Sequence, residues 1–314
     1  MKLHQGIGST SHLPVNASSP GAPRVDGVVW SIGMYVGDSP LLLRPPDTIG
    51  NPVLTRERVT DVQAALVADP FMLSVQHTWY MFFEVMNWRT AKGEIGLATS
   101  EDAVRWTYQQ IVLTEPFHLS YPYVFEWQNE YYMLPETYQA ESVRLYRATN
   151  FPTRWSYIAT LLTGYEYVDP SIFRFDERWW MFVGHGTPAS HRADILRLYS
   201  ADDLFGPWRE HPNSPIITGN AHIARPAGRV LVIDDKIVRY TQDCAPHYGA
   251  LVRAFEITEL TPTSYYERQG GGTDAIVGAS GSGWNAAGMH HIDPHLGADG
   301  QWIACVDGWQ RPPR

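Results

Sequence analysis

The feature that most constrains the fold is a short motif that recurs five times, an extended apolar stretch followed by a polar residue and then proline. The motif ends at Pro70, Pro122, Pro170, Pro226 and Pro294, so that successive copies lie 48 to 68 residues apart. Repeats of about 50 residues are typical of β-propellers, in which each repeat forms a four-stranded blade around a central channel. The motif therefore predicts an all-β chain folded as a five-bladed β-propeller.

The residues between the prolines support this prediction. Runs rich in aromatic and β-branched residues, such as 79–83, 131–134 and 179–182, alternate with the turn-forming residues Gly, Asn, Asp and Pro. Helical periodicity is absent apart from a brief stretch around 61–66. We therefore expect strands throughout the repeats.

The two ends of the chain are expected to share the last blade. The fifth repeat contains only two strand-like runs, 291–296 and 301–306, and residues 28–35 and 40–43 have the pattern of the missing third and fourth strands. We expect 28–35 to pair antiparallel with 301–306, which leaves no free sheet edge between the first and last blades. Residues 25–314 are assigned to a single domain and residues 1–24 to a flexible segment.

Charge and hydropathy exclude several classes of function. The net charge is −9 and the chain has no run of Lys or Arg, so it lacks the basic patch of a nucleic-acid binder. No stretch reaches the roughly 20 apolar residues that span a bilayer, and the first 24 residues lack the apolar core of a signal peptide. Two cysteines make no disulfide framework. We expect a soluble, cytoplasmic protein without a nucleic-acid or membrane partner. Its oligomeric state is not predicted.

The residue before each proline is a candidate site residue. In a propeller the first strand of each blade lines the channel, and proline is tolerated there because this strand is an edge. Proline also favours an extended conformation for the residue before it. These five side chains should therefore converge around the axis: Asp69, Tyr121, Asp169, Arg225 and Asp293. The alternative is that each Asp only accepts hydrogen bonds within a turn.

A second set of polar residues follows the apolar second strands: Glu84, Glu136, His185, Asp243 and Asp307. A carboxylate in such a position is costly to bury unless it is paired or protonated. One interpretation is an ion pair with Arg225 or Arg239. The other is a raised pKa, which would make Glu84 or Glu136 a general acid.

Several of these residues, with others in the later repeats, suit a sugar. Arg and Gln side chains can form paired hydrogen bonds with vicinal hydroxyls or with a carboxylate. The predicted substrate-binding residues are Glu84, Tyr121, His222, Arg225, Gln242, Asp243, His291 and Asp293. The cluster from His290 to Asp293 has neither the helical spacing nor the cysteine partners of a transition-metal site. A Ca²⁺ or Na⁺ ion bound on the axis remains an alternative. We predict no metal ligand and no cofactor.

Several motifs resemble the N-terminal domain of the plant glucosamine inositolphosphorylceramide transferase family. They lie at 68–71, 82–84, 118–122, 135–136, 224–228 and 242–244. The resemblance runs from about Trp30 to the end of the chain. It implies the five-bladed propeller group that includes glycoside hydrolase families 43 and 32. The plant proteins carry a separate glycosyltransferase domain after this one, so transferase activity does not carry over.

The resemblance also implies site roles. In those hydrolases one Asp acts as base or nucleophile, a second Asp orients and tunes, and a Glu is the acid. Asp69 and Asp169 match the two Asp positions, while Arg225 stands where the Glu would begin its strand. By elimination, Glu136, which follows Leu134 and Pro135, is the predicted acid in its place. The predicted catalytic residues are thus Asp69, Glu136 and Asp169.

Three functions follow from these observations. The preferred one is a carbohydrate-active enzyme, a glycoside hydrolase that cleaves a furanoside or short glycan with paired carboxylates. The alternative is a non-catalytic glycan-binding propeller that accompanies a separate glycosyltransferase. A protein-interaction propeller is third, because such a scaffold does not need acidic residues facing its channel.

Overall fold

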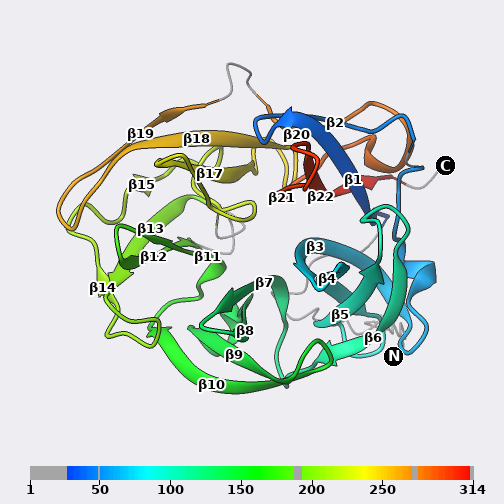
Figure 1. Ribbon diagram of the computed structural model, residues 1–314, viewed down its shortest axis with the longest axis horizontal. Coiled ribbons are helices and arrows are strands. Elements are labelled where there is room, and N and C mark those ends of the chain that lie inside the picture. The colour runs from blue at the N-terminus through cyan, green and yellow to red at the C-terminus, as the bar shows by residue number, and fades with distance from the viewer. Residues whose placement is uncertain (1–26, 49, 187–192, 271–274, 312–314) are drawn as a thin grey trace, which may run out of the picture.

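The computed structural model describes residues 27–48, 50–186, 193–270 and 275–311. They form five antiparallel sheets arranged in a ring, so the chain is the predicted five-bladed β-propeller (Figure 1). The expected segment 1–24 lies outside the described residues. Within the described ranges three short 3-10 helices complete the elements, η1 (Arg56–Arg58), η2 (Tyr138–Ala140) and η4 (Gly283–Asn285).

The first three blades follow one another along the chain. Blade one contains β3 (Ala64–Val75), β4 (Thr78–Asn87), β5 (Lys92–Ser100) and β6 (Thr107–Leu113). Blade two contains β7 (Ser120–Trp127), β8 (Glu130–Glu136), β9 (Ser142–Asn150) and β10 (Arg154–Thr163). Blade three contains β11 (Val168–Phe175), β12 (Arg178–His185), β13 (Ile195–Ala201) and β14 (Arg209–Glu210), with β15 (Ile217–Thr218) also paired to β13.

The last two blades complete the ring. Blade four contains β16 (Leu231–Ile233), β17 (Lys236–Asp243), β18 (Leu251–Leu260) and β19 (Tyr265–Gln269), with β20 (Val277–Gly278) also paired to β18. Blade five contains β21 (Ile292–Leu296), β22 (Trp302–Gln310), β1 (Val29–Ser39) and β2 (Leu42–Arg44).

The shared last blade is confirmed. β1 pairs antiparallel with β22 in a continuous register from Val29 opposite Gln310 to Gly37 opposite Trp302. In Figure 1 the blue β1 lies beside the red β22. The two ends of the sequence are therefore joined by backbone hydrogen bonds, and the ring closes without a free edge between blades five and one.

The second strands are buried on both faces, which explains their run of large apolar residues. Met81, Phe82 and Phe83 in β4 are each 0% exposed, although they alternate between the faces of the sheet. A strand with only one covered face would expose every second side chain. Here neighbouring blades cover both faces: Phe82 packs edge-on against Trp155 of blade two.

Two local expectations are wrong. The stretch around 61–66 is not helical, because β3 begins at Ala64 and pairs with β4. The residue before proline is not extended in three blades: φ is 52° at Asp69, 47° at Tyr121 and 50° at Asp169. Each lies at an irregularity in the pairing of the two innermost strands. Tertiary contacts, described below, override the preference that proline imposes.

The described residues contain no helix that is both long enough and apolar enough to cross a membrane.

Candidate functional site

Five carboxylates from four blades gather near the axis. Inner strands β3 and β11 supply Asp69 and Asp169, and second strands supply Glu84, Glu136 and Asp307. All five residues are less than 10% exposed. Hydrogen bonds join Asp69 to Asp307 and Asp169 to Glu136, and the charges of all four also raise the pKa of Glu84, so the five residues form one cluster. Below, the axial cluster means these five residues.

The unusual backbone before the prolines is fixed by this cluster. The Asp69 N–H donates to Asp307 Oδ2 at 3.0 Å, the Tyr121 N–H to Asp69 Oδ2 at 3.3 Å and the Asp169 N–H to Glu136 Oε2 at 3.1 Å. Positive φ in a non-glycine residue costs of order 1–3 kcal/mol and is concentrated at functional sites. The bulges thus direct three N–H groups at carboxylates.

Arg225 joins two members of the cluster. Its Nε donates to Asp169 Oδ2 at 2.5 Å, and its Nη2 lies 3.4 Å from Glu136 Oε2. Gln242 Nε2 donates to the same Asp169 oxygen at 2.9 Å. The guanidinium also lies over the Tyr248 ring, 5.2 Å from its centroid. Asp169 is therefore held by a cation and an amide.

His290 bridges two other members. Its Nδ1 lies 2.8 Å from Asp307 Oδ2, and its Nε2 lies 3.8 Å from Asp69 Oδ1. The imidazole stacks on Trp30, with ring centroids 4.2 Å apart. Ligand atoms of Asp69, His290 and Asp307 come within 4.8 Å of one another, a spacing that a metal ion could use. They already pair with one another, so we treat them as an ion-pair network.

The surroundings shift the pKa values of the carboxyl groups in the axial cluster in opposite directions. Burial raises the pKa of Asp69 to about 7, with the charge of His290 opposing and the charges of Asp307 and Asp169 adding to the rise. Burial and neighbouring carboxylates also raise the pKa values of Glu84 and Glu136 well above their usual range. For Asp307, burial is outweighed by His290, which leaves the pKa below its usual value. Carboxyls of both kinds are thus close together, as acid–base chemistry requires.

The remaining inner-strand Asp belongs to a neighbouring network. Asp293 accepts from Arg229 Nε at 2.7 Å, from His295 Nε2 at 2.8 Å and from the Met72 N–H at 2.7 Å. Burial would raise its pKa, but Arg229 and then His295 hold it below its usual range. Asp293 is therefore a fully paired carboxylate next to the axial cluster.

Two predicted binding residues lie deep in the ring. The Tyr121 hydroxyl contacts Ser171 Oγ at 2.7 Å, donates to the Gly228 carbonyl at 2.9 Å and accepts from the Gly228 N–H at 2.6 Å. His291 is 1% exposed, packs edge-on against Phe71 and Tyr121, and lies 3.9 Å from Asp69 Oδ1. Tyr121 thus ties blade two to blades three and four across the axis.

His222 and Asp243 form a separate dyad. His222 Nδ1 lies 2.9 Å from Asp243 Oδ1, and Arg253 Nη2 donates to Asp243 Oδ2 at 2.9 Å. Burial would raise the Asp243 pKa, but these hydrogen bonds and the Ala245 N–H lower it overall. The His222 side chain is 56% exposed. This dyad is the only part of the predicted binding set, among the described residues, with so exposed a side chain.

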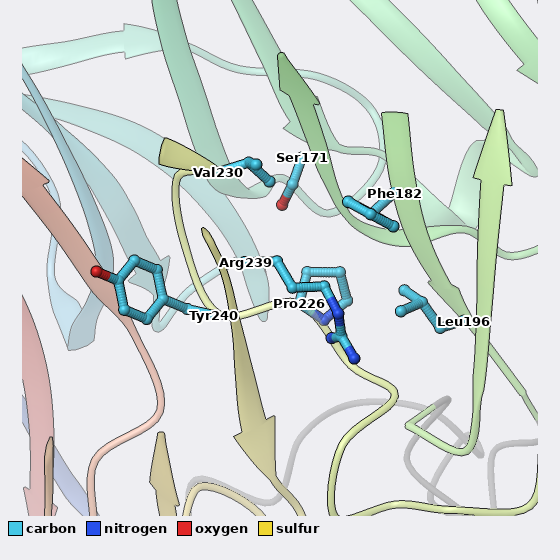
Figure 2. Close-up of a pocket in the computed structure, with 7 residues that line it drawn as sticks. All are labelled: Ser171, Phe182, Leu196, Pro226, Val230, Arg239 and Tyr240. Carbon is cyan, nitrogen blue, oxygen red and sulfur yellow. The ribbon is translucent and has the colours of Figure 1, made fainter. Parts of the chain in front are cut away.

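The pocket in Figure 2 lies between blades three and four. Its lining residues are Ser171, Phe182, Leu196, Pro226, Val230, Arg239 and Tyr240. Arg239 bonds to Glu267 at 2.5 and 2.7 Å, so it does not pair with Glu84 or Glu136 as one interpretation of the sequence expected. The lining of this pocket is mostly apolar and contains no carboxylate, so we interpret it as a gap in the packing between the two blades.

Some residues of the site are absent from the sequence-based set. His118, Arg229, Tyr248 and His290 each contact a predicted site residue but carry no repeat signal of their own. Asp307 does carry a signal, its place after an apolar second strand, which also marks Glu84 and Glu136. Position in the repeat therefore singled out Asp307 without assigning it a role, whereas the other four depend on tertiary contacts.

A family model and individual relatives of this chain point to the same family. Residues 24–309 match the model of "glucosamine inositolphosphorylceramide transferase 1, N-terminal". The rice (Oryza sativa subsp. japonica) protein glucosamine inositolphosphorylceramide transferase 1 is 36% identical over 302 residues, which cover 90% of this chain and 40% of the relative. The Arabidopsis thaliana protein of the same name is 34% identical over 325 residues, covering 96% and 41%. The chain thus spans about 40% of the length of these relatives.

A solved structure shares the fold. A glycosyl hydrolase from Bacteroides ovatus superposes with a TM-score of 0.57 at 12% identity, covering 86% of this chain and 93% of that one. At this identity the likeness concerns the fold alone.

Proposed function

Because the chain belongs to the glucosamine inositolphosphorylceramide transferase 1 N-terminal family and has a propeller fold found in glycoside hydrolases, we propose that its axial cluster binds a sugar and hydrolyses a glycosidic bond. The observation that carries the proposal is one buried cluster of five carboxyl groups from four blades, in which Arg225 pairs with Asp169 and His290 pairs with Asp307. Burial raises the pKa of Asp69 to about 7 and raises the pKa values of Glu84 and Glu136 well above their usual range, while His290 holds the pKa of Asp307 below its usual value.

The proposed chemistry uses two carboxyl groups. A water molecule attacks the anomeric carbon while Asp69 accepts the proton of that water. A protonated glutamic acid gives its proton to the leaving oxygen as the C–O bond breaks. The residue predicted from the sequence for this role is Glu136. Asp169, held by Arg225 and Gln242, orients the sugar and stabilises the positive charge that develops on the ring. The substrate class we propose is a furanoside or short glycan.

A second candidate is a glycan-binding module without catalysis, acting beside a separate glycosyltransferase. The observation in its favour is Arg225, which contacts both Asp169 and Glu136 and neutralises part of the cluster. The relatives are named as transferases, and the chain spans only about 40% of their length.

The test is hydrolysis of a panel of aryl and unactivated furanosides and pyranosides. Asp69→Asn should lower kcat by about 10²- to 10⁴-fold, the usual contribution of a general base. Asp235→Asn, in the exposed turn between β16 and β17, is the matched control and should retain full activity. Sugar binding by the unmodified protein without turnover on any substrate would favour the binding module instead.

A further inference from the structure

The two buried glutamates of the axial cluster have different neighbours. Glu136 lies 3.4 Å from Arg225 Nη2 and accepts the Asp169 N–H at 3.1 Å. Glu84 lies instead beside the imidazole of His118, whose Nε2 is 3.6 Å from Glu84 Oε1. The positive charge of Arg225 opposes the rise of the Glu136 pKa, whereas a neutral ring stabilises a neighbouring carboxylate only through the dipole of its N–H. The two glutamates are therefore not equivalent as proton donors.

The hydrogen bond on the far side of His118 fixes its tautomer. The Gly93 N–H donates to His118 Nδ1 at 2.9 Å, so Nδ1 is an acceptor and the ring proton lies on Nε2. Burial, with a smaller contribution from the charge of Arg225, lowers the pKa of His118 to about 4. The ring is thus neutral near pH 7 and presents an N–H, without positive charge, to Glu84.

Gly93 makes this arrangement possible. A Cβ at this position would lie 2.1 Å from the Leu119 carbonyl oxygen, 2.8 Å from His118 Cε1 and 2.9 Å from Glu84 Oε1. Only glycine lets the start of β5 approach both groups this closely. The backbone is therefore shaped around the His118 and Glu84 side chains.

The charged groups that most affect Glu84 are all negative. They are Asp69 on β3, Glu136 on β8, Asp169 on β11 and Asp307 on β22. Each favours the protonated form of Glu84, and burial acts in the same direction. His118, on the segment between β6 and β7, is neutral and adds no opposing charge.

Resting on the proposed function, we propose that Glu84 is the carboxyl group that protonates the leaving oxygen, and that His118 is the residue that positions it. As the glycosidic C–O bond breaks, the Glu84 O–H bond breaks and its proton passes to the leaving oxygen. Asp69 accepts a proton from the attacking water, and exchange with solvent then restores both groups. At 3.6 Å the Nε2–H of His118 acts on Glu84 Oε1 through its dipole, at a distance longer than a normal hydrogen bond. Glu136 stays paired with Arg225.

The first experiment compares Glu84→Gln with Glu136→Gln on sugars with good and poor leaving groups. Glu84→Gln should lower turnover of unactivated substrates by about 10²- to 10⁴-fold. It should affect activated aryl glycosides far less, because these need little protonation. Glu136→Gln should affect both classes equally. The reverse pattern would overturn the assignment of Glu84, and circular dichroism spectra establish that each variant is folded.

The second experiment distinguishes the roles of the two ring nitrogens of His118, Nδ1 towards Gly93 and Nε2 towards Glu84. His118→Gln retains a donor near the position of Nε2, whereas His118→Asn retains only the acceptor for the Gly93 N–H. Losing a donor that stabilises the Glu84 anion should move the alkaline limb of the kcat/KM profile to higher pH in His118→Asn but not in His118→Gln. Identical profiles for the two variants would remove His118 from the positioning role.

A third measurement distinguishes failure of this inference from failure of the proposed function. Carboxyl groups of ¹³C-labelled Glu are titrated by NMR, and the signal that Glu84→Gln removes should still be protonated at pH 7. An ionised Glu84 there would refute the donor role even if the protein hydrolyses sugars. Absence of turnover by the unmodified protein on every substrate would instead refute the proposed function, and the donor role with it.

Discussion

At the scale of single residues, the two buried glutamates of the axial cluster oppose folding at neutral pH. Glu84 is 7% exposed and Glu136 3% exposed, and both have pKa values raised first by burial. A carboxyl with a raised pKa binds its proton more tightly in the folded chain than in the unfolded chain. Stability is therefore lost as pH rises from the unfolded value, about 4.3, towards the folded value. Such a cost is typical of groups kept for function.

Replacing one of these groups by its amide should reveal this cost. Glu84→Gln has no proton to lose, so its stability relative to the unmodified protein should increase above pH 4. The slope of this difference should approach about 1.4 kcal/mol per pH unit. Urea unfolding at pH 4, 6 and 8 measures it. Glu259→Gln, at an exposed position of β18, should show no such trend. A difference that stays constant with pH would contradict the raised pKa.

At the scale of elements, the inner strands carry the same irregularity in three blades. The bulges at Asp69, Tyr121 and Asp169 turn N–H groups towards axial carboxylates, and the one in β7 also points the Tyr121 hydroxyl at Gly228. Irregular pairing is thus repeated because each blade contributes a polar group to the centre.

The Tyr121 hydroxyl provides the test of this cross-axis contact. Tyr121→Phe leaves the Gly228 N–H without its partner and weakens the contacts of Ser171, so the free energy of unfolding should fall by about 1–3 kcal/mol. Tyr157→Phe removes a hydroxyl that contacts Thr160 on the surface and should change stability by less than about 0.5 kcal/mol. Equal effects in chemical denaturation would show that Tyr121 does not tie the blades together.

At the scale of the whole molecule, closure depends on both ends of the sequence. β1 and β22 pair along nine register positions, and β1 also contacts β3 of blade one. Without β1 and β2, β22 becomes an exposed edge with unpaired N–H and C=O groups. Such an edge recruits other strands.

A chain lacking residues 1–45 should therefore aggregate or form dimers in size-exclusion chromatography. A synthetic peptide of residues 27–45 supplies β1 and β2 in trans and should restore a monodisperse species. A peptide of the same composition in scrambled order is the control. A truncated chain that is monomeric and folded by itself would contradict the role of this closure.

The sequence alone determined the blade number and the closure. Both depend on local signals that repeat along the chain: an apolar stretch, a polar residue and proline, followed by aromatic strands. The same repeat brought Asp69, Glu84, Glu136 and Asp169 forward as candidates, because equivalent positions in a ring converge on its axis. Asp243 also comes from this pattern, yet its carboxylate pairs with His222 and Arg253.

Only the tertiary structure decided how these groups pair. The N–H of Asp69 is held by Asp307, 238 residues away, which overrides the extended conformation that proline favours. Arg225 from the start of blade four contacts Glu136 of blade two and Asp169 of blade three. Glu136 therefore has a cationic neighbour in the guanidinium, whereas Glu84 has the imidazole of His118. The tautomer of His118 depends on the N–H of Gly93 in blade one. These contacts are set by burial and distance across the ring, and a one-dimensional pattern contains neither.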